Sequence, residues 1–456
     1  MNLDNSSHPQ SQPQARPTQT QTLALLETIL IFVGMGVLFL AVPHRLTSDG
    51  LIRFKAVTEL LVEGKVSDMG LSMVGPLFCV PLWFLGRIYP SPEWWCARYN
   101  FLVFAFGLFA IYRIFKGHMP GGVLRKFALI LIFGSMFPHH QADFFGEMFT
   151  AILVGVGIAA VTCLRSRWGW VCMVLGAANI PASMVGLGCV VLVKSAQARR
   201  WGYLLVPVAA AVLVLGESWI RRGDPFVTGY EGDRGFKTVM PYSGRPGFSY
   251  PFFFGVISIL FSFGKGLFLF APGLLLSIGR RMSATKKEVH TTYRLWIWFL
   301  VGMVLVYSRW YAWYGGWYWG PRFFLFASIP ASFALAVRLS AARESFASNL
   351  LTLGVLVLSF WVGVNGAVFD QNNLELCTAN KYELEFLCWY VPEFSVLFRP
   401  FVEASPLAPR EVSILLYGLV VCAYLAIPLL SALLKAATTK AAQLRRALVT
   451  RGGWRF

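Results

Sequence analysis

Runs of apolar residues recur along the whole chain, and they restrict its fold more than any other feature. We expect about twelve of them to cross a bilayer, because a helix satisfies its own backbone hydrogen bonds in lipid. The runs lie at residues 23–42, 99–115, 127–137, 148–164, 168–180, 182–193, 203–219, 251–278, 295–307, 323–337, 350–368 and 412–434. The 456 residues are 56% hydrophobic and 14% charged, with a mean hydropathy of +0.59. The expected fold class is an all-α polytopic membrane protein with interfacial helices in the first external loop.

The basic residues orient these predicted helices. The net charge is +18, and the Lys and Arg residues gather in short loops and in the C-terminal tail. Because cytoplasmic loops carry an excess of Lys and Arg, the best assignment places both termini in the cytoplasm. It keeps residues 71–88, which contain Pro76 and Pro81, at the interface and not across the membrane. No nucleic-acid-binding motif accompanies the positive charge.

Three parts of the chain follow from this assignment. Residues 1–21 are expected to be a disordered cytoplasmic tail, residues 22–434 the transmembrane domain, and residues 435–456 a basic cytoplasmic tail. The external loops are expected at residues 43–98, 138–147, 220–250, 308–322 and 369–411. Cys377 and Cys388 share the last loop, where a disulfide is sterically possible and the compartment would be oxidising. The other six Cys residues are expected to be small core residues.

The first external loop begins with an acidic residue at the start of a short amphipathic helix. Ser48 or Asp49 would make a good N-cap for this helix, which is expected to lie on the membrane surface. As a cap, Asp49 would stabilise the helix by about 1 kcal/mol. As a general base, the same carboxylate would accept a proton from an acceptor hydroxyl. Both roles remain open for Asp49, and one residue can serve both.

A second polar cluster lies between two predicted spans and contains His139, His140, Asp143 and Glu147. Adjacent His residues rarely bind one ion together, and no metal-ligand spacing is present, so we expect no metal site. Glu147 would be either a favourable charge at a helix start or a group that contacts substrate.

Two further segments carry polar residues into the external half. The Gly-Asp-Pro-Phe-Val-Thr-Gly-Tyr stretch contains Asp224 and Tyr230. Lys265 stands between Gly264 and Gly266 in an apolar segment. A helix break there would free backbone donors and direct the ammonium at an anion, or Lys265 would simply extend to the interface.

The densest aromatic stretch, which we name the aromatic loop, is residues 309–322: Arg-Trp-Tyr-Ala-Trp-Tyr-Gly-Gly-Trp-Tyr-Trp-Gly-Pro-Arg. Its Gly pair and its Gly-Pro step stop a helix from continuing. It is either an interfacial aromatic belt or a rigid surface that holds Arg322 beside a phosphate. Its candidate substrate-binding residues are Trp313, Tyr314, Trp317, Trp319 and Arg322.

Taken together, Asp49, the segment Gly-Lys-Gly-Leu-Phe-Leu-Phe-Ala-Pro and the aromatic loop resemble the GT-C integral-membrane glycosyltransferases. The likeness covers roughly residues 22–337. It implies a polyprenyl-phosphate-linked sugar donor, an active site on the periplasmic or extracellular face, and an acceptor that is a glycan, lipid or protein. By this resemblance Asp49 is the acid of the first external loop, and Asp143 or Glu147 is the second. Asp49-Gly50 stands where many relatives have Asp-Glu, so a divalent metal is possible but not expected.

The expected function is transfer of a sugar to an acceptor hydroxyl, with inversion, in a bacterial inner membrane. Asp49 would activate the acceptor, and Lys265 with Arg322 would hold the donor phosphate. The main alternative is a polytopic transporter or lipid flippase, and a receptor or scaffold is a third. No internal repeat is visible in the sequence, and the polar residues gather at one face, which disfavours the transporter.

Overall fold

The computed structural model describes residues 19–316, 318–340, 345–369, 375–403 and 406–451. Within those ranges the chain is helical and contains no strand, apart from isolated bridges at Arg45–Asp143 and Lys116–Met119. The predicted disordered tail lies largely outside the described residues, and α1 begins at Gln19. The expected all-α class is therefore confirmed for the described part of the chain.

The elements of the first half are α1 (Gln19–Leu40), α2 (Ser48–Glu63), α3 (Val74–Leu77), α4 (Val80–Gly86), α5 (Pro92–Ala97), α6 (Tyr99–Phe115), α7 (Gly121–Phe133), α8 (Phe137–His140), α9 (Gly146–Cys163), α10 (Trp168–Asn179), η1 (Pro181–Ser183), α11 (Met184–Ala198), η2 (Trp201–Leu204) and α12 (Leu205–Arg222). Those of the second half are α13 (Phe252–Phe261), α14 (Leu267–Phe270), η3 (Pro272–Leu275), η4 (Gly279–Ala284), α15 (Lys287–Tyr307), η5 (Arg322–Ala327), α16 (Ser328–Leu339), α17 (Phe346–Val368), α18 (Glu375–Tyr382), α19 (Glu385–Tyr390), η7 (Pro392–Phe394), η8 (Arg399–Phe401) and α20 (Pro409–Arg451).

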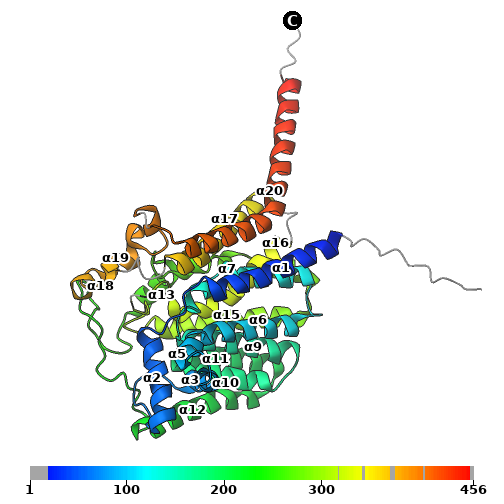
Figure 1. The fold of residues 1–456 in the computed structure, drawn as a ribbon. Coiled ribbons are helices and arrows are strands. Elements are labelled where there is room, and N and C mark those ends of the chain that lie inside the picture. The colour runs from blue at the N-terminus through cyan, green and yellow to red at the C-terminus, as the bar shows by residue number, and fades with distance from the viewer. Residues whose placement is uncertain (1–18, 317, 341–344, 370–374, 404–405, 452–456) are drawn as a thin grey trace, which may run out of the picture.

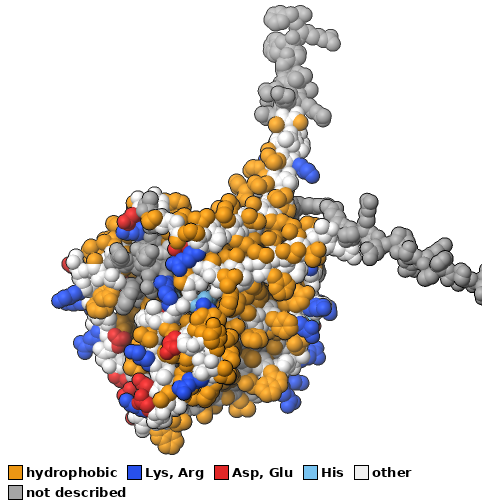
Figure 2. Space-filling view, in the orientation of Figure 1, with side chains coloured by type: hydrophobic (Ala, Val, Ile, Leu, Met, Phe, Trp, Pro, Cys, Tyr) orange, Lys and Arg blue, Asp and Glu red, His pale blue; other side chains and the backbone are white. Residues whose placement is uncertain are grey.

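Eight helices among the described residues are long and apolar enough to cross a membrane. Two shorter apolar helices, α6 and α13, accompany them. Helices at the periphery carry large exposed apolar side chains, such as Phe32 on α1 and Ile220 on α12. Figure 2 shows apolar side chains covering the middle of the molecule, with charged side chains toward its two ends. Because exposing such a large apolar surface to water would be unfavourable, the protein is an integral membrane protein.

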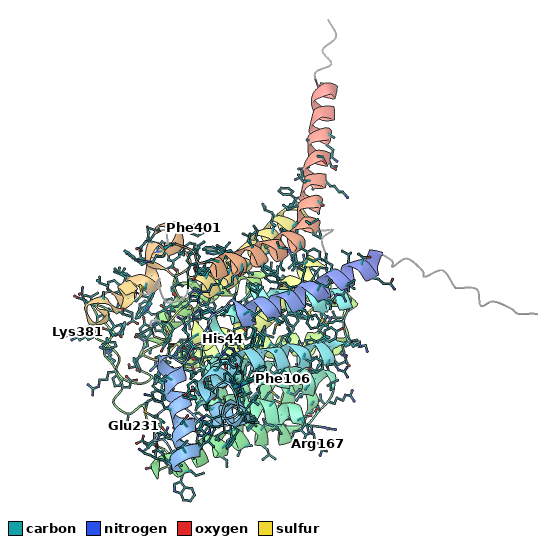
Figure 3. The ribbon with its side chains drawn as sticks, in the orientation of Figure 1. His44, Phe106, Arg167, Glu231, Lys381 and Phe401 are labelled. Atoms are coloured by element: carbon teal, nitrogen blue, oxygen red, sulfur yellow. A yellow bond between two sulfur atoms is a disulfide. The ribbon has the colours of Figure 1, made fainter. Side chains whose placement is uncertain are left out.

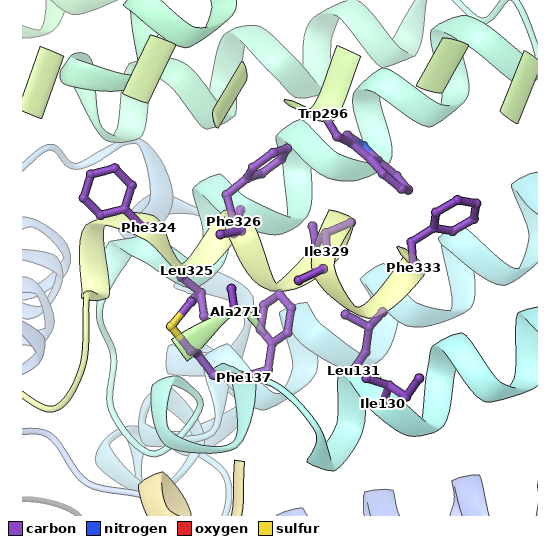
Figure 4. Close-up of a cluster of buried hydrophobic side chains, with 14 of the residues drawn as sticks. Ile130, Leu131, Phe137, Ala271, Trp296, Phe324, Leu325, Phe326, Ile329 and Phe333 are labelled. Carbon is purple, nitrogen blue, oxygen red and sulfur yellow. The ribbon is translucent and has the colours of Figure 1, made fainter. Parts of the chain in front are cut away.

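Among the eight candidate spans, the segment from η5 into α16 is the most buried, and every residue of α16 is buried. Its side chains interdigitate with those of α7, α8 and α15, as Phe326, Ile329 and Phe333 show beside Trp296 and Leu131 (Figure 4). Arg322 is the first residue of this segment. A tightly packed core element therefore fixes the backbone position of Arg322.

Residues 43–98, which were predicted to be the first external loop, fold as short helices at one end of the bundle. Figure 1 shows α2 crossing the ends of the long helices, at the end where α18 and α19 also lie. The stretch 71–88 forms only α3 and α4, and the seven residues of α4 cannot cross a bilayer. The N-terminal start of α1 and the end of α20 lie away from this region (Figure 1). The expected 435–456 tail is helical as far as Arg451.

One expectation about α2 is wrong. Its N-cap is Thr47, and neither Ser48 nor Asp49 occupies the capping position. Ser48 takes a left-handed backbone conformation with φ 42°, which turns the chain into the helix at this point. Asp49 is thereby carried on the first turn of α2, and its carboxylate is available for a partner from another element.

Candidate functional site: a buried charge cluster

Asp49 and Arg322 form an ion pair although 273 residues separate them. Arg322 Nη1 donates to Asp49 Oδ2 at 2.8 Å, with the Asp49 side chain 25% exposed and that of Arg322 12% exposed. Burial by itself raises the pKa of Asp49, but the adjacent Arg322 outweighs it and holds that pKa below the ordinary value. The pair joins the surface helix α2 to the start of the buried η5–α16 segment.

Glu147 is the second carboxylate at Arg322. It lies in the first turn of α9, and its Oε1 is 3.6 Å from Arg322 Nε. The guanidinium also stacks over the Tyr318 ring at 4.3 Å and lies 5.2 Å from the Phe323 ring. Aromatic faces and carboxylates therefore fix the orientation of Arg322.

Arg53 is a member of the candidate site that was not predicted from the sequence. It follows Asp49 by four residues, so both lie on one face of α2. Arg53 is buried, its Nη1 donates to the Ser72 carbonyl at 3.0 Å, and a methyl group on Gly146 would lie 2.6 Å from its Nη2. Burial lowers the pKa of Arg53, while the charges of Glu147 and Asp49 oppose the shift. The spacing from Asp49 on an amphipathic helix was the signal available in the sequence.

These four residues (Asp49, Arg53, Glu147 and Arg322) form what we name the charge cluster. Its formal charges cancel, yet some of its hydrogen-bonding capacity is unused. Among the described residues, neither Arg53 Nε nor Arg322 Nε has a hydrogen-bond partner. Buried guanidinium donors without acceptors are costly, and an anion entering the cluster would satisfy them.

Tyr230 faces the charge cluster from the long loop after α12. Burial raises the pKa of Tyr230, and so does the charge of Asp49, whereas Arg53 and Arg322 oppose the shift. Asp224, from the same loop, does not join it. Its Oδ1 accepts a hydrogen bond from Phe226 N at 2.8 Å in an exposed turn, and no contact among the described residues links it to Arg322.

Asp143 has a structural role beside the cluster. Its carboxylate accepts hydrogen bonds from Thr47 N at 3.1 Å, from Phe144 N at 2.7 Å and from the Thr47 hydroxyl. Burial raises the pKa of Asp143 to about 6 against these bonds. A side chain at Gly50 would overlap Asp143 Oδ1, so glycine after Asp49 follows from this close packing.

The two histidines lie beneath the site and not in it. His139 Nδ1 is 3.0 Å from the Gly366 carbonyl, and its ring lies 4.8 Å from the Trp319 ring. His140 is buried next to His139. Burial lowers the pKa of His139 to about 4 and lowers the pKa of His140 well below its ordinary value. Both rings are therefore neutral packing groups at physiological pH.

Lys265 lies in the predicted helix break, between α13 and α14, but not beside a vacant anion site. Its buried Nζ donates to the carbonyls of Gly316 and Gly320 at 3.0 Å each and to the Tyr318 carbonyl. The freed backbone donors are also used, since Gly264 N donates to the Trp389 carbonyl at 3.0 Å. All three ammonium protons have acceptors, so the expected contact of Lys265 with phosphate is replaced by support of the aromatic loop.

The aromatic loop breaks the helix where its glycines predicted, with φ of 75°, 78° and 62° at Gly315, Gly316 and Gly320. Trp313 and Tyr314 pack on Trp389 of α19, with Tyr314 stacked at 3.8 Å. Trp319 is buried and donates to Asn365 Oδ1 at 2.8 Å. Trp317 lies outside the described residues. Tyr318, which was not among the predicted residues, is the ring beneath Arg322, and its hydroxyl donates to Ser48 Oγ.

The described residues contain no group of three or more His, Cys, Asp or Glu side chains arranged to hold a metal ion. The chain is therefore a polytopic helical membrane protein with the charge cluster at one end of its bundle. No protein-family model matches the chain, and no curated protein matches it significantly.

Proposed function

We propose that the protein is a membrane glycosyltransferase of the GT-C type that moves a sugar from a polyprenyl-phosphate donor to an acceptor hydroxyl. The observation that carries this proposal is the ion pair between Asp49 and Arg322, with Arg53 and Glu147 beside it. Charges at membrane depth are costly, and this cluster brings four of them together. The acceptor is a glycan, a lipid or a protein.

The proposed sugar transfer requires cationic groups that bind the donor phosphate and a general base, and the charge cluster contains both. Arg322 and Arg53 would bind the donor phosphate through their unused donors. The acceptor hydroxyl would give its proton to Asp49 as its oxygen attacks the anomeric carbon. The bond from that carbon to the phosphate oxygen breaks, and the guanidinium groups stabilise the charge left on the lipid phosphate. Attack opposite the leaving group gives inversion.

The lipid part of the donor needs an apolar path that is open to the bilayer. A groove of about 390 Å³ runs between α4, α6, α9 and α10, and we name it the lateral groove. Its lining is almost wholly apolar, and Phe78, Tyr99 and Phe149 stand at the end that lies nearest Glu147 on α9. Part of a prenyl chain would fit in this groove while its phosphate reaches the cluster.

The same proposal includes the finer topology. In this topology all twelve apolar runs, each of which contains a helical segment among the described residues, would cross the membrane. Both termini would lie in the cytoplasm, and the cluster would lie on the periplasmic or extracellular face of a bacterial inner membrane. The Cys377–Cys388 disulfide, with Cα atoms 6.0 Å apart, favours an oxidising compartment for that loop. No metal is required by the groups assigned here.

Sugar transfer by the purified protein in lipid nanodiscs tests the proposal. The substrate is a radiolabelled polyprenyl-phosphate sugar, offered with a lipid extract as acceptor. Asp49→Asn is expected to lower the rate by roughly 10²–10⁴-fold, the range for loss of a general base. Asp224→Asn is the matched control, because that carboxylate lies in an exposed turn and is expected to keep the wild-type rate.

Two outcomes would contradict the proposal. If Asp49→Asn transferred sugar at the wild-type rate, Asp49 would not be the general base of the proposed reaction. Movement of the intact lipid between vesicles, with no transfer of sugar, would favour the transporter or flippase instead.

A further inference from the structure

Cys79 and Cys96 form a buried sulfur pair away from the charge cluster. Cys79 joins α3 to α4, Cys96 lies in α5, and both side chains are wholly buried. Their Sγ atoms are 3.1 Å apart across 17 residues of sequence. Two thiols at that distance are closer than an ordinary non-bonded sulfur contact, and a small rotation of either side chain brings the sulfurs to bonding distance.

The surroundings of the pair are apolar. Phe54, Val57, Trp83 and Tyr99 belong to the same packed cluster. The hydrogen bond that the Cys79 thiol donates to Cys96, together with burial, raises the pKa of Cys79 far above its ordinary value. Folded thiols in this setting are inert, so any bond between them forms during folding, before the pair is enclosed.

The pair lies at the end of the bundle that already holds a disulfide. Figure 1 places α3 and α5 beside α2, toward the end where α18 and α19 carry Cys377 and Cys388. We propose that Cys79 and Cys96 form a second disulfide. Each thiol loses a proton, and their two electrons reduce the disulfide of a partner thiol oxidoreductase to two thiols. This inference rests on the external placement of that end and not on the transfer reaction.

The bond would position the α3 segment, which lies behind the charge cluster. The α3 segment, which ends two residues before Cys79, receives a hydrogen bond from Tyr99 Oη to the Gly75 carbonyl at 2.9 Å. Asn179 accepts from Gly75 N at 3.0 Å and donates to the Gly146 carbonyl at 2.8 Å, next to Glu147. Joining α4 to α5 through the disulfide would hold the α3 segment in place between Arg53 and the lateral groove.

Counting the free thiols tests the proposal without any measurement of activity. Cells are lysed with N-ethylmaleimide, and the purified chain is denatured in SDS without reductant and treated with a second, heavier maleimide. Intact mass then reports how many of the eight Cys carry either label. With both disulfides present, four are labelled, namely Cys163, Cys172, Cys189 and Cys422. Prior reduction gives eight.

Six labelled Cys residues in the unreduced C377S/C388S variant would overturn the proposal, as would a proteolytic map that links Cys79 or Cys96 to another cysteine. Two variants sharpen the count. C79S exposes Cys96 and raises the count from four to five, whereas the C377S/C388S double variant still gives four. Because the chain is denatured for labelling, burial hides no thiol from the maleimide, and both results stand whether or not the protein transfers sugar.

Discussion

Arg322 donates from Nη1 to Asp49 while its Nε faces Glu147, so one guanidinium holds two carboxylates from different helices. The ion pair keeps the pKa of Asp49 below its ordinary value despite burial, and a carboxylate with a lowered pKa is a weak base. A donor phosphate that takes Arg322 as its partner would release Asp49 and raise its basicity. In the proposed reaction, donor binding would thus prepare the base.

The pH dependence of stability checks the ion pair directly. Since the folded pKa of Asp49 lies below 3.8, its ionised form stabilises the fold at every pH above that value. This contribution is lost only as the pH falls through the lowered pKa. The difference in melting temperature between wild type and Asp49→Asn is therefore expected to stay constant from pH 5 to 8 and to shrink below pH 4. A steady change across pH 5 to 8 would contradict the ion pair.

Single residues show where sequence reasoning succeeds. Asp49 and Arg322 were both predicted at the external ends of apolar runs, and polar groups excluded from lipid must gather at such ends. Arg53 was missed because an arginine on an amphipathic helix ordinarily faces water, and only the folded loops after α2 bury it. The role of Lys265 was mistaken because the sequence does not indicate which carbonyls will surround an ammonium.

At the scale of elements, the aromatic loop depends on a contact from another segment. The Lys265 ammonium joins the carbonyls of Gly316, Tyr318 and Gly320, and Tyr318 in turn lies under Arg322. Support of the site therefore passes from the α13–α14 break through the loop to the guanidinium. The loop is a built surface, in which Trp313 and Trp319 are buried, and not a belt of exposed rings.

Removing this support has a predictable cost. Lys265→Met leaves three buried carbonyls without their donor, which should lower the free energy of unfolding by roughly 3 kcal/mol. Lys237→Met is the control, since Lys237 is exposed and is expected to leave stability nearly unchanged. Thermal unfolding of both variants in the same detergent gives the comparison. Equal melting temperatures for the two variants would show that the ammonium does not hold the loop.

The lateral groove gives a second prediction at this scale. Ala110 on α6 lines the groove, and Ala110→Phe would fill part of it. The variant is expected to raise KM for a long-chain donor at least about tenfold, with kcat little changed, because the chain contributes uniform binding. Ala105→Phe is the matched control, a half-buried alanine of the same helix outside the groove. If both variants raise KM equally, the groove is not the site of the chain.

Across the whole molecule, hydropathy predicted the positions of the helices better than their lengths. Pro181 separates α10 from α11, and the break around Lys265 divides the run 251–278 into α13 and α14. These two breaks shorten α10 and α13, and α6 and α7 are also shorter than a candidate span. Eight helices among the described residues therefore meet the length for a span, against about twelve apolar runs. The burial of α16 was equally invisible, because a central helix and a lipid-facing one are both apolar.

The orientation of the bundle is the property on which the external site depends. Figure 3 places Arg167 at one end and Glu231 and Lys381 toward the other, while Figure 2 shows Lys and Arg side chains along the edge of the first end. By the positive-inside rule we expect the first end to be cytoplasmic. Single cysteines at Arg167 and Asp233, both exposed positions, report on the two ends.

In a background without the four half-buried Cys residues, a membrane-impermeant maleimide should label Asp233→Cys in intact cells. Arg167→Cys should be labelled only after the membrane is permeabilised. The reverse pattern would place the charge cluster in the cytoplasm, where disulfides do not persist and where the proposed lipid-linked donor would have to be presented from the other leaflet. One labelling experiment therefore decides the side on which Asp49 and Arg322 would act.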